Sequence, residues 1–388
     1  MYDPNILLIA LVRYTLTKKQ SSDLPKECLS KEEALAVIEL SKAHGVFAMV
    51  ATAMKQLNIL PESLSTSVNM TILLAVQKTE RFQALQHNII LVLAKHKFDF
   101  ILLKGAVLRP YYPESWMRSS GDLDILVREQ EVEYAAKVLV NELSFKRGER
   151  NYHDISLLSK GGCLVELHFN IMENMPKIDG VLSTVWDHAR KKEKDGYCFV
   201  LSDEFQLFHL LCHTLYHFLH GGCGIRPLLD IWLWQQQKTL DYDNFLALCD
   251  QCGITKFFKA INALLDVWIE QQQPDKMLLQ LQNYIFRGGI AGTKENEVLV
   301  RAVNKSNSEY MKERLFWSLD VLQKKYPRLK KHPWLLPFYQ LRRFLNIFSA
   351  KKRKHLFNSF KAEKEVRKNL KEEQYSQTKK MLTQLDLI

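Results

Sequence analysis

The stretch RSSGDLDILV, residues 118–127, decides the fold of this chain. Its last six residues form a short, mostly apolar run that predicts a buried strand, and Asp122 and Asp124 stand at the start of that run. Residues two apart on a strand project from the same face, so the two carboxylates lie together while the apolar residues face the core. The pattern therefore places two acids at one point beside a buried strand.

A bound cation is one way to relieve the repulsion between two carboxylates this close. Mg²⁺ prefers oxygen ligands and is commonly held by one or two carboxylates together with substrate phosphates. Glu166, in the segment LVELH of a later predicted strand, is the candidate third acid of a two-metal site, and His168 projects from the same strand face. Gly121 and Asp122 also suit a turn, so the alternative that both aspartates are turn or edge residues stays open.

Short strands alternate with helices around this stretch. We expect further strands in residues 97–105, 153–159 and 163–171, and helices over about residues 105–112 and 129–143. The sequence KGG at residues 160–162 predicts a hairpin turn between two of the strands. Interposed helices with some antiparallel strands describe a small mixed α/β domain over about residues 97–200.

Helical periodicity dominates both flanks of this domain. Residues 31–57 and 69–96 repeat apolar positions at spacings of three and four, and Ser30 with Glu33 predicts a capping box where the first helix begins. The pattern becomes helical again from Ser202 onward. We expect an α+β fold with a small mixed-sheet core flanked by helical N- and C-terminal regions. The expected parts are a helical region at 1–95, an α/β core at 96–200, a helical domain at 201–325 and a basic helical region at 326–388.

The composition is that of a soluble globular protein, with 388 residues, 47% apolar and 25% charged. No run of about 18 apolar residues predicts a membrane span, and no secretory signal opens the chain, so we expect a cytoplasmic protein. Seven scattered cysteines predict reduced thiols. The lone pair in CDQC, residues 249–252, predicts a helix end closed by Gly253 rather than a zinc site.

The net charge of +11 is unevenly distributed. Residues 311–388 carry a net charge of +13, which leaves −2 for residues 1–310. Such a basic region could attract nucleic acid or another polyanion. Nucleic acid is not favoured as a partner, because the region lacks a basic motif interleaved with aromatic residues.

Three segments together resemble a known family: LLKGAVL (residues 102–108), RSSGDLDILV (118–127) and VELHFNI (165–171). They look like the uncharacterised bacterial nucleotidyltransferases of the DNA polymerase β-like superfamily, over roughly residues 90–230. The resemblance implies metal-dependent transfer of a nucleoside monophosphate from an NTP, such as ATP, to a hydroxyl acceptor with release of pyrophosphate. Asp122, Asp124 and Glu166 would be the catalytic acids and would hold two Mg²⁺ ions. The acceptor could be a small molecule, a sugar phosphate or a protein side chain.

A second set of residues is predicted to contact the nucleotide. The set comprises Lys104, Gly105, Arg118, Ser120, His168, His213, Arg226 and Asp230. Lys104 could offer a charge to phosphate, and Gly105 permits close backbone approach, whereas Arg118 could clamp phosphate or pair with Asp122. Ala106 stands where the superfamily carries a serine that holds the triphosphate. This departure favours the alternative of a non-catalytic nucleotide- or polyanion-binding module that recruits a partner through its basic C-terminal region.

A stripe of four histidines follows in the C-terminal region. His209, His213, His217 and His220 recur at spacings of four, four and three, so they share one face of a predicted helix. Histidines four apart can share a zinc ion, but no acid or cysteine pattern typical of zinc enzymes accompanies them. We predict that the stripe packs against a helix or lines the substrate cleft.

Overall fold

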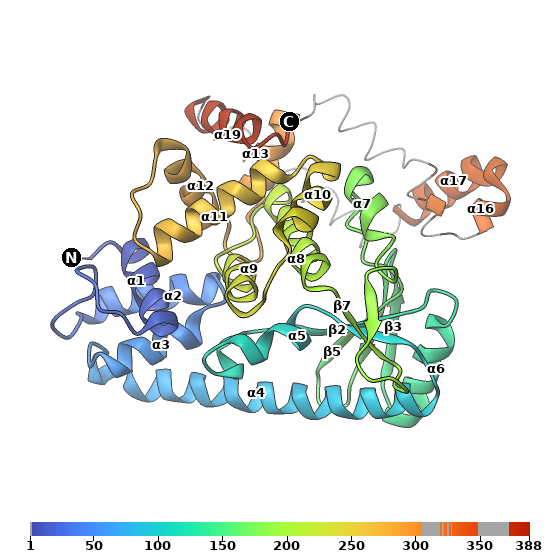
Figure 1. Cartoon of the computed structure of the whole chain (residues 1–388), viewed down its shortest axis with the longest axis horizontal. Helices are drawn as coiled ribbons and strands as arrows, with labels where there is room; N and C mark the ends of the chain where they lie inside the picture. The colour runs from blue at the N-terminus through green and yellow to red at the C-terminus, as the bar shows by residue number, and fades with distance from the viewer. Residues whose placement is uncertain (1, 305–318, 320–321, 324–325, 327, 348–371) are drawn as a thin grey trace.

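The computed structural model of the chain describes residues 2–304, 319, 322–323, 326, 328–347 and 372–388 (Figure 1). Four helices precede the sheet: α1 (Pro4–Thr17), α2 (Lys31–Ala43), α3 (Phe47–Gln56) and α4 (Glu62–Lys95). The predicted capping box is confirmed, because Ser30 and Glu33 each accept a hydrogen bond from the other's backbone N–H. The helix predicted over residues 31–57 is instead two helices, since Gly45 between them adopts a left-handed φ of 70°.

Seven strands form one mixed sheet in the order β3-β4-β5-β2-β1-β7-β6. Their bounds are β1 (Phe100–Leu102), β2 (Asp122–Val127), β3 (Lys146–Arg150), β4 (Asp154–Leu158), β5 (Leu164–His168), β6 (Ala189–Lys191) and β7 (Cys198–Leu201). The pairs β2·β5 and β1·β7 are parallel and the other neighbours antiparallel. The four predicted strands correspond to β1, β2, β4 and β5, and the predicted hairpin joins β4 to β5. The strands β3, β6 and β7 were not predicted. The strands β3 and β6 are polar and largely exposed, so they lack the apolar pattern of a buried strand.

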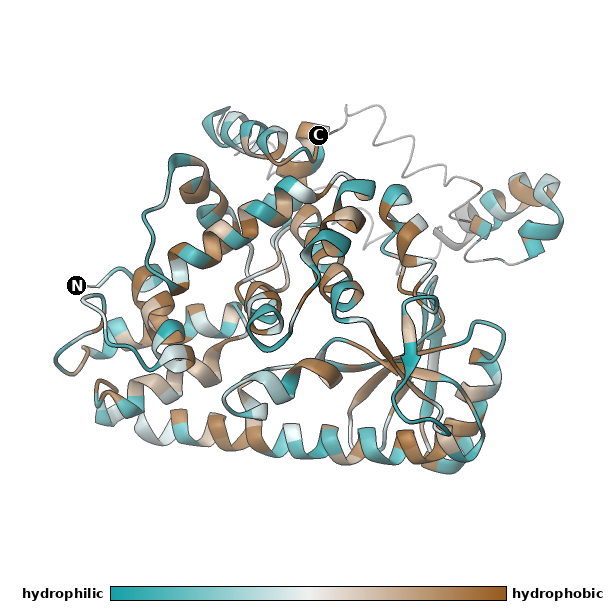
Figure 2. Cartoon of the chain, viewed as in Figure 1, coloured by the Kyte–Doolittle hydropathy of each residue, from teal (hydrophilic) through white to brown (hydrophobic). Residues whose placement is uncertain are grey.

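The two faces of the sheet differ in what covers them. One face packs on the C-terminal half of α4 and on α6 (Val132–Leu143), and Figure 2 shows hydrophobic residues on the central strands. Leu123, Ile125 and Val127 of β2 point into this core and are at most 1% exposed, as expected. The opposite face of β2 carries Asp122 and Asp124, which therefore point away from the apolar layer.

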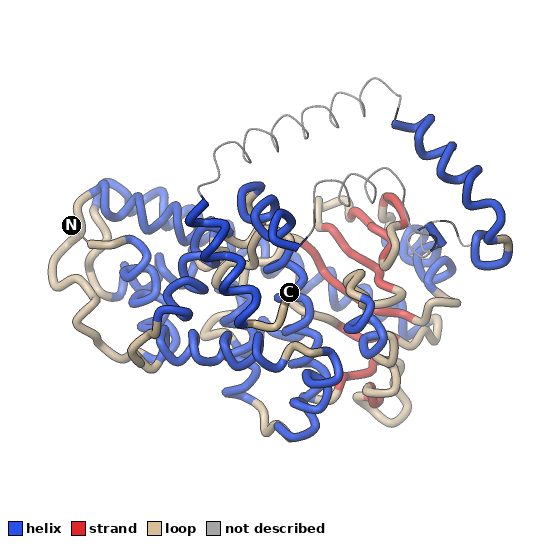
Figure 3. The backbone as a smooth tube through the Cα atoms, turned by 90° about the horizontal axis from the view of Figure 1, so that it is seen from above, coloured by secondary structure: helices blue, strands red, loops and turns tan. Residues whose placement is uncertain are grey.

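Helices dominate the rest of the chain. They are α5 (Gly105–Leu108), α7 (Pro176–Leu182), α8 (Asp203–Leu219), α9 (Arg226–Gln237), α10 (Tyr242–Cys252), α11 (Thr255–Ile269), α12 (Lys276–Gly288), α13 (Lys294–Asn304), α16 (Arg328–Lys331), α17 (Leu336–Ile347) and α19 (Glu372–Gln384), with short 3₁₀ turns η1 (Arg109–Tyr111), η2 (Ser115–Met117) and η3 (Pro333–Leu335). Gly253 closes α10 with a φ of 71°, as predicted for CDQC, and all seven cysteines are free thiols. Seen from above, the sheet lies toward one end of the molecule and the N-terminal helices toward the other (Figure 3).

Two further predictions concern the basic C-terminal region and the absence of a membrane span. The basic helical region predicted at 326–388 includes residues 348–371, which lie outside the described residues. Among the helices that the structure does describe, none combines the length and the apolar character needed to cross a membrane.

Candidate active site

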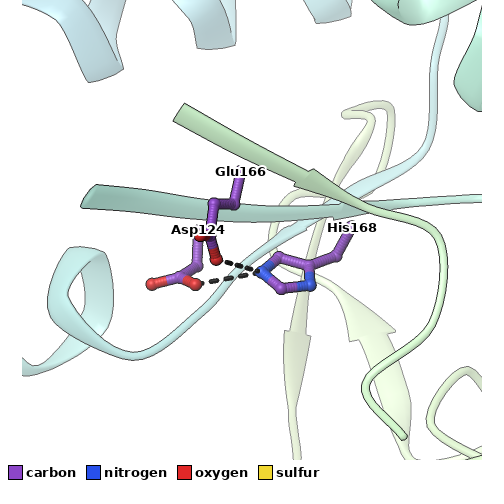
Figure 4. Close-up of side chains that lie close together, drawn as sticks. All are labelled: Asp124, Glu166 and His168. Atoms are coloured by element: carbon purple, nitrogen blue, oxygen red, sulfur yellow. Dashed lines mark hydrogen bonds and ion pairs between the residues drawn. The ribbon is translucent and has the colours of Figure 1, made fainter. Parts of the chain in front are cut away.

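The parallel register of β2 and β5 brings the predicted acids together. Asp124 pairs directly with Glu166 across the two strands, and His168 follows two residues later on the same face. The Asp124 Oδ1 atom lies 2.9 Å from His168 Nε2, which lies 3.5 Å from Glu166 Oε2 (Figure 4). One ligand atom from each residue falls within 4.8 Å of the others, which is the geometry of a metal-binding group. Asp122 lies outside this close group, two residues before Asp124 on the same strand face.

Lys104 occupies the other side of Asp124. Its Nζ atom lies 2.9 Å from Asp124 Oδ1, and both side chains are largely buried. Lys104 holds a φ of 44°, a left-handed conformation uncommon for a residue with a side chain, at the point where β1 gives way to α5. Lys104 and His168 therefore both balance the charge of Asp124.

This arrangement sets the protonation of the group. Burial alone would raise the pKa of Asp124, but the Lys104 charge and the hydrogen bond with His168 hold it well below its usual range. Burial would lower the pKa of His168, yet its hydrogen bonds with Asp124 and Glu166 raise it to about 9. Burial and the neighbouring charge of Asp124 raise the pKa of Asp122. The two aspartates thus differ in acidity although they share one strand face.

A cavity of about 360 Å³ opens over this group and lies within the size range typical of small-molecule sites. Helices α8 and α9 close it from the side opposite the sheet. All eleven residues singled out from the sequence line this cavity: Lys104, Gly105, Arg118, Ser120, Asp122, Asp124, Glu166, His168, His213, Arg226 and Asp230. Their convergence from the sheet, the β1–β2 connection and two helices makes the cavity the candidate active site.

Arg118 anchors the β1–β2 connection to α9. Its Nε and Nη2 atoms donate to the two carboxylate oxygens of Asp230 at 2.8 and 2.7 Å, and the pair is buried. Tyr112 also donates to Asp230, at 2.7 Å, and Arg118 Nη1 donates to Ser120 Oγ at 2.9 Å. The ion-pair partner of Arg118 is therefore Asp230 and not Asp122.

Gly105 provides the close approach that this anchor needs. A Cβ atom at this position would stand 2.6 Å from both Arg118 Nη1 and Ser120 Oγ, closer than such contacts occur. The absence of a side chain at the start of α5 therefore serves the packing of Arg118 and Ser120. It also brings the Ser120 hydroxyl beside α5.

Three of the four stripe histidines line the cavity, as predicted: His209, His213 and His217. The fourth, His220, instead bonds the backbone oxygen of Tyr216 with its Nδ1 atom at 2.7 Å. Burial, followed by the charge of Lys104, lowers the pKa of His209 to about 3. The stripe forms no metal-binding group in the described part of the chain.

His213 makes the contact that the sequence did not predict. Its Nδ1 atom lies 2.7 Å from Glu173 Oε1, and its Nε2 atom lies 3.2 Å from His217 Nε2. His213, Arg226 and Asp230, all predicted to contact the nucleotide, line one cavity, but His213 bonds Glu173 and Asp230 bonds Arg118. Glu173 follows β5 in an irregular segment with no motif around it, so only the fold reveals that it contacts His213.

Comparison with known proteins gives one match. The sequence model of a family described as "Uncharacterised nucleotidyltransferase" matches residues 30–270, which is more than half of the chain. The matched range runs from α2 to α11 and contains all eleven predicted site residues. No curated protein and no solved structure matches the chain.

Proposed function

Because the chain belongs to this family of uncharacterised nucleotidyltransferases, we propose that it transfers a nucleoside monophosphate from an NTP such as ATP to a hydroxyl acceptor. The observation that carries the proposal is the convergence of Asp124, Glu166 and His168 in a polar cavity. In the proposed reaction the acceptor oxygen bonds to the α-phosphorus and the bond from that phosphorus to the bridging oxygen breaks. Pyrophosphate leaves and the hydroxyl proton passes to solvent.

We propose that divalent ions bind at the acidic end of the cavity. The sequence predicted Asp122, Asp124 and Glu166 as the ligands, and their carboxylate oxygens suit Mg²⁺. The three residues that lie closest together are instead Asp124, Glu166 and His168, so an imidazole takes the place of the Asp122 carboxylate. His168 would have to release its proton to bind a metal, because only the neutral imidazole is a ligand. A neutral imidazole suits Mn²⁺ and other transition metals better than Mg²⁺, so both ions belong in the test. A bound ion would supply Lewis-acid stabilisation of the phosphate charge.

Two cations remain available for the triphosphate. The buried Arg226 Nε atom has no hydrogen-bond partner among the described residues, although Nη1 donates to the Ser119 backbone oxygen at 2.7 Å. Lys104 keeps two N–H donors beyond its bond to Asp124. Arg118 uses all three of its nitrogens within the protein, so we assign it to positioning of the β1–β2 connection and not to phosphate contact.

Calorimetry of ATP binding, with Mg²⁺, with Mn²⁺ and with EDTA, tests this proposal. Glu166→Gln is the most informative variant, because the Glu166 side chain is 25% exposed and, among the described residues, its only polar side-chain contact is the 3.5 Å one with His168. We expect metal-dependent binding in the wild type and at least a tenfold loss in Glu166→Gln. The matched control is Asp99→Asn, which removes an acid that pairs with Arg128 and does not line the cavity. Equal affinity in EDTA and Mg²⁺ would contradict a metal site.

One pair of observations favours the non-catalytic alternative. Lys104 already neutralises Asp124, and Ala106 stands where the superfamily has a serine. The Ser120 hydroxyl, which lies beside the start of α5, is our candidate for that missing contact. Release of labelled pyrophosphate from γ-labelled ATP, measured with and without small hydroxyl compounds, separates the two functions. Tight ATP binding with no release under any condition would support a binding module.

A further inference from the structure

A second cavity, of about 250 Å³, lies between the N-terminal helices and the β1–β2 connection. It is lined by α2, α3, α4, η1 and η2 and by the segment 118–120. Its walls are mainly apolar and include Phe47, Phe82 and Trp116. Because it is slightly smaller than most pockets for drug-sized ligands, about 300 to 1,000 Å³, it suits a small ligand with an apolar body.

The charged residues of this cavity are all basic. Lys42 and Lys78 stand at its exposed rim and Arg109 lies deeper, while no aspartate or glutamate belongs to the lining that the structure describes. Lys42 pairs with Glu39, and both side chains are exposed. Such an excess of cations in a mainly apolar cavity is complementary to an anionic ligand.

Arg109 gives the strongest indication of a ligand. Its side chain is only 3% exposed, its Nη1 atom has no hydrogen-bond partner, and no ion pair in the described part of the chain includes it. Its guanidinium carbon lies 5.3 Å from the centre of the Phe82 ring. Burial, followed by the charge of Arg118, lowers the pKa of Arg109 to about 10. The charges of Asp122 and Asp124 also act on Arg109, but neither acid forms an ion pair with it. Because buried charges are ordinarily paired, this guanidinium could accept an anionic partner.

The second cavity adjoins the candidate active site. Arg118 and Ser120 line both cavities, and Asp122 follows two residues after Ser120. A nucleobase carries no charge and would leave the excess of cations unexplained. The ligand that fits is instead an anion with a compact apolar body.

We propose that this cavity binds the acceptor substrate, a small hydroxyl compound with an apolar or aromatic body and a carboxylate or phosphate group. The anion pairs with Arg109, while the body contacts the Phe47, Phe82 and Trp116 walls. The assignment as acceptor rests on the proposed nucleotidyl transfer, but the anion pocket itself does not. The acceptor is therefore a small molecule and not a protein side chain.

The test measures the affinity of the pocket for small probes and does not require catalytic turnover. Calorimetry on the full chain compares 1-naphthoate, a compact aromatic acid, with the neutral 1-naphthylmethanol. Ala75→Phe fills the cavity from a half-buried position on α4, and Ala84→Phe makes the same change at an exposed position on α4 outside the lining. Arg109→Met removes the buried charge and keeps an unbranched apolar side chain.

We expect the wild type to bind 1-naphthoate at least tenfold more tightly than 1-naphthylmethanol. Ala75→Phe should weaken binding at least tenfold and Ala84→Phe by less than threefold, and Arg109→Met should abolish the preference for the acid. Equal affinity for both probes, or no effect of Ala75→Phe, would overturn the pocket assignment. If Arg109→Met fails to fold, the comparison of Ala75→Phe with Ala84→Phe still shows whether 1-naphthoate binds in this cavity.

A second arm separates the acceptor role from the proposed transfer. We expect 1-naphthoate to bind with affinity changed less than threefold when Mg²⁺ and ATP are saturating, because acceptor and donor must be bound together. Direct competition with ATP would assign the cavity to the nucleotide and overturn the acceptor role. If the protein binds 1-naphthoate but no NTP, the result would support the anion pocket and contradict the proposed nucleotidyl transfer.

Discussion

Arg118 and Asp230, 112 positions apart in the chain, form a buried bidentate ion pair at 2.7 and 2.8 Å. The pair ties the connection that precedes β2 to the first turns of α9, so it fixes the sheet against the helical region that closes the active-site cavity. Arginine suits this role because its planar fork matches both carboxylate oxygens at once. The position of the β2 acids relative to the opposite cavity wall therefore depends in part on this ion pair.

Loss of the Asp230 charge should destabilise the protein strongly. In Asp230→Asn the buried Arg118 keeps its charge but loses its counter-ion, which typically costs about 3 to 5 kcal/mol. The free energy of unfolding in urea measures this loss. Asp243→Asn, at an exposed position of α10, is the control and should change stability by less than about 1 kcal/mol. A similar effect of the two changes would mean that the ion pair contributes little.

Neutralisation of the two strand acids should have different effects on stability. Asp124→Asn removes the counter-ion of Lys104, so we expect a loss of about 3 kcal/mol or more. Asp122→Asn removes a charge that burial and Asp124 already disfavour, so stability should rise or change by less than about 1 kcal/mol. Thermal denaturation of both variants shows which of them is the less stable. The reverse order would contradict the assigned electrostatics.

The packing of Gly105 predicts a cost for the smallest possible substitution. Gly105→Ala would force the added carbon against Arg118 and Ser120, and Asp230 prevents Arg118 from moving freely. Overpacking of this kind costs about 1 to 3 kcal/mol and should also weaken Mg²⁺-dependent ATP binding. Gly121→Ala is the matched control in the same cavity, because no atom lies within 4 Å of its added carbon. Equal effects would refute the close-approach role of Gly105.

The placement of the acidic residues of the candidate site was largely predictable from sequence. Alternating side chains on β2 and β5 determine which residues share a face, so Asp124, Glu166 and His168 follow from two short motifs. The hairpin at 160–162 sets the antiparallel pairing of β4 with β5, and its turn residues are explicit in the chain. Local rules of strand geometry determine which residues share a face, but they do not determine the parallel pairing of β2 with β5 that brings the two faces together.

The polar walls of the cavity were not predictable in the same way. The partners of Arg118 and His213 are Asp230 and Glu173, and both contacts depend on how helices pack against the sheet. The sequence predicted that Lys104 could offer a charge to phosphate, but it did not predict its ion pair with Asp124, which follows from the positive φ of Lys104 after β1. Side-chain partners far apart in sequence depend on tertiary packing, which periodicity does not specify.

The contact of Glu173 with His213 predicts one tautomer. The carboxylate accepts from His213 Nδ1–H, which leaves Nε2 as the acceptor for the Nε2–H of His217. Nitrogen-15 NMR of histidine-labelled protein should therefore report a protonated Nδ1 on His213 in the wild type. Glu173→Gln should alter the His213 and His217 signals and leave those of His188, which stacks on Phe205, unchanged. Unchanged His213 signals would argue against this hydrogen-bond chain.

Stability should fall in mild acid because of His44. This residue is fully buried at the end of α2, against the edge of Phe286, and burial lowers its pKa to about 4. The unfolded chain binds the proton near pH 6.5, so the folded state favours the neutral ring. Its contribution is complete above about pH 6.5 and is lost as the pH falls from there toward 4, by up to about 3 kcal/mol. His209, His213 and His217 also have lowered pKa values and act in the same direction, whereas that of His168 is raised. The informative quantity is therefore the difference between wild type and His44→Phe in urea unfolding at pH 7.5 and pH 5. The variant should lose less stability than the wild type over this interval, and parallel profiles would show that His44 does not carry this dependence.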